Sequence, residues 1–219
     1  MKIKQLDLYT SNIDAMISFY QQLLQLPVQA KENELTITIG LTIIRFHKSD
    51  VASHPFYHFA INIPANKIEE ARDWMNKKAP LMWMEDYKNV IADFKSWNAQ
   101  SVYFLDAAGN IVELIARFDL STNTVENFGP SHFLSVSEIG LVFKQEEIEQ
   151  RTNSILGNYQ LDYFEKQKPF PDFKAVGNDE GLFIIATEGR NWYPTQLPAK
   201  IFPTKITFEV KGIDYTAHF

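Results

Sequence analysis

A unit with the order strand–helix–strand–strand–strand is repeated along this chain, with three predicted copies and the start of a fourth, and this repeat restricts the possible folds more than any other feature. Each unit opens with residues in the order polar, apolar, small or polar, apolar, at 5–8, 58–61 and 138–141. A predicted helix with capping residues follows each opening segment. The repeat therefore predicts one supersecondary module used several times.

The spacing of apolar residues predicts the elements of each module. The first has strands over 3–9, 28–30, 35–39 and 41–47 and a helix over 12–25. The second has strands over 57–63, 81–84, 100–105 and 111–116 and a helix that is capped at 65–66 and ends near 78. The third has strands over 138–143, 161–164, 173–176 and 182–187 and a helix over 144–156, with Gly157 at its C′ position. Residues 205–210 predict the first strand of an uncompleted fourth unit.

Charge and composition exclude several classes of function. The chain has 219 residues, a net charge of −6 and scattered Lys and Arg, which argues against nucleic-acid binding. It has neither a leader-like apolar run nor one long enough to span a bilayer, so we expect a cytoplasmic protein without a membrane partner. Because it has no Cys, any metal would be bound by His, Asp, Glu, Gln or Asn.

A carboxylate lies inside the last strand of the second module, where Glu113 stands between Val112 and Leu114. A tight turn over 106–110, with Asp, Gly and Asn at its positions, connects this strand to the one before it. Because both faces of the strand are otherwise apolar, Glu113 either faces solvent or is buried beside a cation or metal.

The paired modules, the Phe19-Tyr20 pair and the segment Leu105-Asp106-Ala107-Ala108-Gly109-Asn110-Ile111-Val112-Glu113-Leu114 resemble the vicinal oxygen chelate superfamily. This group includes glyoxalase I, extradiol dioxygenases, and bleomycin- and fosfomycin-resistance proteins. The family usually has Pro where Ala107 stands. The resemblance implies an α+β fold in which paired βαβββ modules form a curled open sheet with a cleft, followed by a third, partly complete module.

The resemblance covers residues 1–118 best, which we therefore expect to form a glyoxalase/dioxygenase-like domain. Residues 119–130 are rich in Ser, Thr and Asn and end in Gly129-Pro130, which indicates a linker. Residues 131–219 would then form a partial second domain with one module and a terminal strand.

The superfamily's metal positions fall on the first and last strands of each module and correspond here to Gln5, Arg45, His58 and Glu113. A guanidinium cannot ligate a metal or abstract a proton at neutral pH, so the resemblance disfavours glyoxalase I activity. The remaining set of Gln5, His58 and Glu113 is similar to the two-His-one-carboxylate sites of extradiol enzymes, with Gln replacing one His. It implies a divalent metal such as Fe, Mn, Ni or Zn.

A metal-free interpretation stays open beside this one. Arg45 could bind an anionic oxygen of a substrate, or it could pair with Glu113, in which case no metal would bind. Glu138 holds the position of His58 in the third module, but the strand over 182–186 is wholly apolar. The third module is therefore expected to be structural, covering a sheet edge or contacting a second copy in a homodimer.

Substrate-binding residues are expected beside the ligand candidates. Tyr9 shares a strand face with Gln5, and Asn62 shares one with His58. Trp97 and Tyr103 could add an aromatic wall.

Two functions follow from these interpretations. The first is a metal-dependent dioxygenase, isomerase or lyase that acts on a small oxygenated molecule, with catalytic residues not assigned. The second is a metal-free protein that binds a small molecule or confers resistance to one. The fold alone does not choose between them.

Overall fold

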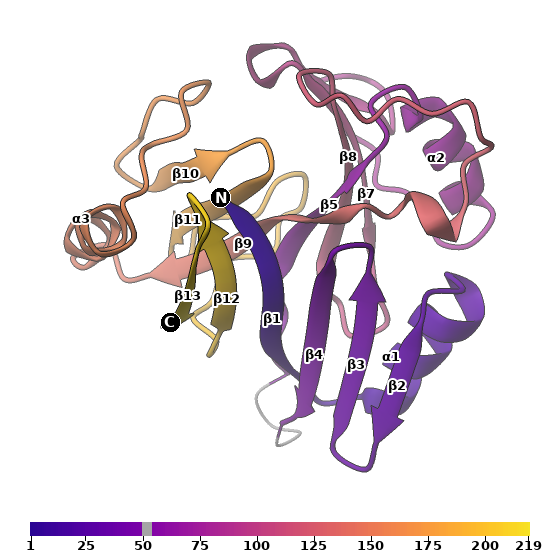
Figure 1. Ribbon diagram of the computed structural model, residues 1–219, viewed down its shortest axis with the longest axis horizontal. Helices are drawn as coiled ribbons and strands as arrows, with labels where there is room; N and C mark the ends of the chain where they lie inside the picture. The colour runs from indigo at the N-terminus through magenta and orange to yellow at the C-terminus, as the bar shows by residue number, and fades with distance from the viewer. Residues whose placement is uncertain (50–53) are drawn as a thin grey trace.

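The computed structural model describes residues 1–49 and 54–219 and contains two mixed β-sheets (Figure 1). The six-stranded sheet has the order β13 (Ile213–His218), β12 (Lys205–Val210), β1 (Lys2–Thr10), β4 (Thr42–Lys48), β3 (Glu34–Ile39), β2 (Val28–Lys31). The seven-stranded sheet has the order β10 (Phe173–Asn178), β11 (Gly181–Thr187), β9 (Ser135–Phe143), β5 (His58–Ile63), β8 (Ile111–Arg117), β7 (Ala99–Leu105), β6 (Ala92–Phe94). The α+β class of paired modules is confirmed.

Each sheet joins two modules through their first strands. In the seven-stranded sheet, β5 of the second module pairs antiparallel with β9 of the third. In the six-stranded sheet, β1 of the first module pairs antiparallel with β12 of the C-terminal hairpin. The first and second modules, which the sequence places next to each other, therefore lie in different sheets. The predicted domain boundaries at 118 and 131 stay a prediction, and β5 and β9 pair across them.

Short helices complete the modules. The first module has α1 (Ile13–Ile17), which continues as the π-helix η1 (Ser18–Leu23), and the second has α2 (Ile68–Asn76). The third has α3 (Ile148–Tyr159), and two 3₁₀ turns lie at η3 (Lys95–Trp97) and η4 (Pro130–His132). The Asn12 side chain caps α1 by accepting from the backbone N–H of Ala15 at 3.1 Å. No helix within the described residues is long and apolar enough to cross a bilayer.

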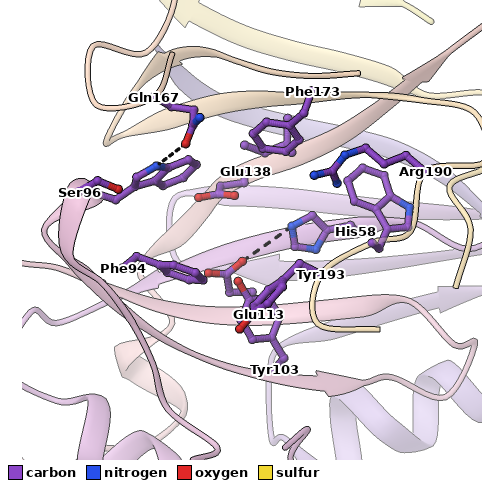
Figure 2. Close-up of a pocket in the computed structure, with 13 residues that line it drawn as sticks. His58, Phe94, Ser96, Tyr103, Glu113, Glu138, Gln167, Phe173, Arg190 and Tyr193 are labelled. Atoms are coloured by element: carbon purple, nitrogen blue, oxygen red, sulfur yellow. Dashed lines mark hydrogen bonds and ion pairs between the residues drawn. The ribbon is translucent and has the colours of Figure 1, made fainter. Parts of the chain in front are cut away.

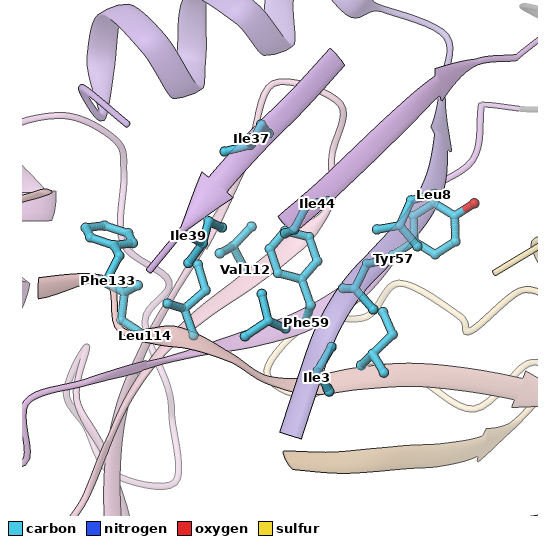
Figure 3. Close-up of a cluster of buried hydrophobic side chains, with 14 of the residues drawn as sticks. Ile3, Leu8, Ile37, Ile39, Ile44, Tyr57, Phe59, Val112, Leu114 and Phe133 are labelled. Carbon is cyan, nitrogen blue, oxygen red and sulfur yellow. The ribbon is translucent and has the colours of Figure 1, made fainter. Parts of the chain in front are cut away.

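One hydrophobic core connects the two sheets. Leu8 and Ile37 from the six-stranded sheet and Phe59 and Val112 from the seven-stranded sheet belong to one buried cluster (Figure 3). Because side chains alternate along a strand, the neighbours of Phe59 and Val112 point to the opposite face of the seven-stranded sheet. That opposite face carries the polar residues of the candidate site.

Several predicted elements differ from the structure. Residues 81–84 and 161–164 are not strands, and each contributes only an isolated bridge, at Met84 and Tyr163. The third helix passes through Gly157 and ends at Tyr159, with Gln160 as its C-cap residue at a φ of 52°. Its extra turn lets Tyr159 pack edge-on against Phe208 at 5.1 Å, so a tertiary contact outweighs the local stop signal. The sequence pattern also missed β6 and β13.

Candidate metal centre

Three buried side chains form the candidate centre, namely His58, Glu113 and Glu138. One ligand atom from each residue lies within 4.8 Å of the others. They come from β5, β8 and β9, which are adjacent strands of one sheet. Figure 2 shows the imidazole and the two carboxylates facing the same cavity.

Strand register explains why these residues meet. Ala60 of β5 lies opposite Glu113 on one side and opposite Glu138 on the other. Opposite residues point to the same face of a sheet, and the small Ala60 side chain leaves the space between the two carboxylates open. His58 lies two residues before Ala60 and therefore shares this face.

His58 is held in a form that can accept a bond. Its Nδ1 lies 3.2 Å from the backbone oxygen of Ile111, so Nδ1 carries the proton and donates to that oxygen. Its Nε2 is then unprotonated and lies 3.7 Å from Oε2 of Glu113. Burial lowers the pKa of His58 to about 4, which keeps the ring neutral at pH 7. Histidines that bind a metal through one ring nitrogen usually donate from the other nitrogen in this way.

Glu113 is oriented by two residues of β7. The Ser101 hydroxyl donates to Oε1 at 2.5 Å, which leaves Oε2 directed toward His58. Tyr103 lies opposite Glu113 in the sheet. Burial raises the pKa of Glu113, while the Ser101 hydrogen bond and the nearby Tyr103 hydroxyl oppose the shift.

Glu138 is paired with the buried Arg117, whose Nη2 donates to Oε1. Arg117 also donates from Nη1 to Asp179 at 3.1 Å, and Lys166 contacts the other oxygen of Asp179 at 2.6 Å. Burial raises the pKa of Glu138, and the nearby Glu113 raises it further. Two buried carboxylates therefore face each other with one guanidinium beside them.

The donor set fits a divalent cation. One imidazole nitrogen and two carboxylates are ligands typical of Fe, Mn, Ni and Zn, and they occupy one side of the site. With both carboxylates ionised, Arg117 balances one negative charge and leaves the other without a partner. A bound cation would remove this imbalance, which burial makes costly. His58, Glu113 and Glu138 are the residues that would hold it.

A cavity of about 290 Å³ opens from these three side chains. Its walls are mainly aromatic and come from the segments 94–97, 103, 173 and 192–193. The Trp192 ring lies 5.2 Å from the His58 ring, and Gly140 makes room for it, since a Cβ there would lie 2.7 Å from Cη2 of Trp192. The volume is near the lower end of the range for small-molecule sites, about 300–1,000 Å³.

The structure brings together only part of the predicted site. His58 and Glu113 face each other, and Trp97 and Tyr103 line the cavity beside them. Asn62 is on the same strand as His58, but its amide donates to the backbone oxygen of Asp179 at 3.1 Å. The functional roles of these residues stay predictions.

The other predicted residues lie in the six-stranded sheet. Gln5 donates to Asp7 at 2.7 Å, and Arg45 contacts Asp7 at 3.3 Å and Glu34 at 3.6 Å. Tyr9 is on the same strand, with its ring 5.6 Å from that of His47. None of the three predicted residues is among the described residues that line the cavity. The predicted Arg45–Glu113 pair is thus replaced by contacts of Arg45 within its own sheet.

Glu138 is the site residue that sequence reasoning did not assign. The signal was present in the repeat, because Glu138 occupies the position of His58 in the next module. The apolar strand over 182–186 suggested a structural module. The site uses only one strand of that module for a candidate ligand, so the apolar strand does not prevent its contribution.

Comparison with solved structures identifies the fold. A candidate dioxygenase from Bacillus subtilis superposes with a TM-score of 0.60 at 14% identity, over 91% of this chain and 65% of that chain. Glyoxalase I from Zea mays superposes with a TM-score of 0.54 at 12% identity, over 85% of this chain and 66% of that chain. The chain thus spans just under two thirds of each.

Neither the family models nor the curated proteins match the sequence. Sequence identities this low support a conclusion about the fold only. The chain has the fold of the vicinal oxygen chelate superfamily, as its repeated modules and its turn sequence predict.

Proposed function

We propose that this protein is a divalent-metal-dependent enzyme that acts on a small oxygenated molecule in the aromatic cavity. The observation that supports it is the convergence of His58, Glu113 and Glu138, whose ligand atoms lie within 4.8 Å at the base of that cavity. Burying two carboxylates costs free energy unless cations balance their charge. Perturbed pKa values of residues in a cavity are typical of functional sites.

The chain's own residues would prepare the site. The hydrogen bond from Ser101 to Oε1 leaves Oε2 of Glu113 free. The hydrogen bond from Nδ1 to Ile111 leaves Nε2 of His58 free, and these two free atoms are directed toward the same point. Arg117 holds Glu138 in place from the far side. The aromatic walls make much of the cavity surface apolar, and a less polar environment strengthens electrostatic interactions. A bound divalent metal would supply Lewis acidity toward a carbonyl, enolate or hydroxyl oxygen of the substrate.

A metal-free binding protein is the second candidate, and one observation favours it. Glu138 already has a cationic partner in Arg117, so part of the acidic charge is balanced without a metal. In that case one proton would be shared by the two facing carboxylates. The aromatic cavity would then bind its ligand without chemistry.

Elemental analysis of the purified protein separates these two functions. The protein is loaded with Fe, Mn, Ni or Zn, desalted and analysed, together with His58→Ala, Glu113→Gln and Glu138→Gln. We expect near-stoichiometric metal in the wild type and its loss in all three variants. Gln5→Ala and Arg45→Ala are controls in the six-stranded sheet and should keep the metal.

The absence of metal after reconstitution would refute the enzyme proposal and favour the binding protein. Metal that persists in all three ligand variants would place the binding site elsewhere. A homodimer is a separate proposal, which sedimentation of the same samples would test.

A further inference from the structure

The cavity has a cation at its wall that the metal centre does not use. Among the described residues that line the cavity, Arg190 is the only Lys or Arg. It follows β11, at the start of the segment that continues to Trp192 and Tyr193. Figure 2 shows its guanidinium beside Phe173, on the same side of the cavity as His58.

Arg190 is held in place by its own neighbours. Its Nε contacts Asp172 at 3.2 Å, and its Nη1 donates to the backbone oxygen of Asn191 at 3.3 Å. The guanidinium carbon lies 4.8 Å from the centre of the Phe173 ring. Within the described part of the chain, Nη2 has no hydrogen-bond acceptor. The Arg190 side chain as a whole is 32% exposed.

A second polar group of the cavity also lacks a partner. The hydroxyl of Tyr193 is buried and has no hydrogen-bond partner among the described residues. Its ring packs edge-on against Tyr103 at 5.8 Å and Phe94 at 5.9 Å. Buried hydroxyls are usually satisfied, so this one leaves hydrogen-bonding capacity that the described residues do not use.

We propose that the cavity selects small aromatic carboxylates, with the aromatic ring among the aromatic side chains and the carboxylate on Arg190. The inference rests on the proposed role of this cavity as the substrate site. Aromatic walls favour a planar ring, because stacked and edge-on ring pairs add attraction beyond area burial. A guanidinium with a free donor favours a carboxylate over a neutral group of the same shape.

Three probes separate the ring from the charge. Benzoate and benzamide have the same shape and differ in charge, whereas cyclohexanecarboxylate keeps the charge and lacks the aromatic ring. Binding is measured by isothermal titration calorimetry, with metal-free and with metal-loaded protein. We expect benzoate to bind about ten- to hundredfold more tightly than benzamide in both forms, the range expected for one hydrogen bond to a charged group. Cyclohexanecarboxylate should bind more weakly than benzoate.

Arg190→Gln should abolish the preference for benzoate over benzamide. Arg151→Gln is the matched control, because Arg151 also lies over a phenylalanine, Phe143, at 5.0 Å but is on α3 and does not line the cavity. It should leave the preference unchanged.

Three results would overturn the inference. They are no binding of benzoate, equal binding of cyclohexanecarboxylate, and a benzoate preference that survives Arg190→Gln. If that surviving preference needs the metal, the carboxylate sits on the metal instead. If the wild-type protein binds no metal but still prefers benzoate over benzamide, and Arg190→Gln removes that preference, only the enzyme proposal is refuted.

Discussion

Tyr20→Phe removes one hydrogen bond that connects the helix of the first module to the turn between β7 and β8 of the second. Tyr20 lies in the π-helix of the first module and is fully buried, and its hydroxyl donates to Oδ2 of Asp106 at 2.8 Å. Asp106 starts the turn that leads into β8 and hence to Glu113. Phenylalanine keeps the shape of the ring, so the variant tests the hydrogen bond without changing the packing.

The contacts of Asp106 set the size of the effect. Its Oδ1 accepts from the backbone N–H groups of Ala108 at 2.9 Å and Asn110 at 3.0 Å, and its Oδ2 accepts from the Asn110 amide at 2.8 Å. Removing the Tyr20 hydroxyl leaves Oδ2 with one donor. A hydrogen bond to a charged group contributes about 1.5–3 kcal/mol. We expect the free energy of unfolding to fall by about this amount at pH 7.5.

The loss should depend on pH, because the hydrogen bond favours the ionised carboxylate. Burial raises the pKa of Asp106 above 3.8, and the bonds from Asn110 and Tyr20 oppose that shift. A raised folded-state pKa makes the folded protein lose stability as pH rises from the unfolded pKa through the folded one. Tyr20→Phe raises the folded pKa further and extends this interval upward. The deficit of the variant is therefore full above the interval and smaller below it.

Urea unfolding followed by circular dichroism at pH 7.5 and at lower pH measures both effects. Tyr215→Phe is the control, because its ring packs against Phe208 at 5.7 Å and its hydroxyl has no hydrogen bond among the described residues. A loss for Tyr20→Phe below about 0.5 kcal/mol, the scatter typical of neutral substitutions, would refute the argument. So would a deficit that grows on acidification.

Three further substitutions test the site. Arg117→Met should lower the free energy of unfolding by about 3–5 kcal/mol in urea, because a buried pair loses one partner, and Glu138→Gln in the same background should restore part of the loss. Ala60→Val should weaken metal binding in calorimetry while the fold measured by circular dichroism persists, because its methyl groups enter the space between the two carboxylates. Ile184→His should tighten metal binding and weaken binding of the aromatic probe, because the new imidazole faces the cavity.

Local patterns in the sequence predicted the modules well because they depend on residues close in the chain. Strand alternation located β1, β5 and β9, and the turn over 106–110 has the expected glycine, Gly109, at a φ of 83°. The failures involve long-range contacts. The extra turn of α3 depends on Phe208, and β13 forms only as the partner of β12.

Only part of the candidate site could be predicted from the sequence, for the same reason. His58 and Glu113 belong to one module, whose first and last strands are adjacent and parallel, so their proximity follows from the module itself. The neighbour of that module is chosen by packing between segments far apart in the chain. The pairing of β5 with β9 brings in Glu138 and leaves Gln5 and Arg45 in the other sheet.

The pairing of β5 with β9 also explains why the candidate centre has an open side. Phe59 lies opposite Ile139, so a local twofold axis through this pair relates His58 to Glu138. The same axis relates Glu113, which lies opposite Ala60, to Ile184, which lies opposite Gly140. Three of the four related positions carry ligand groups and the fourth is apolar. An isoleucine there cannot ligate, so a metal held by the other three would keep positions free on the side where the aromatic cavity opens.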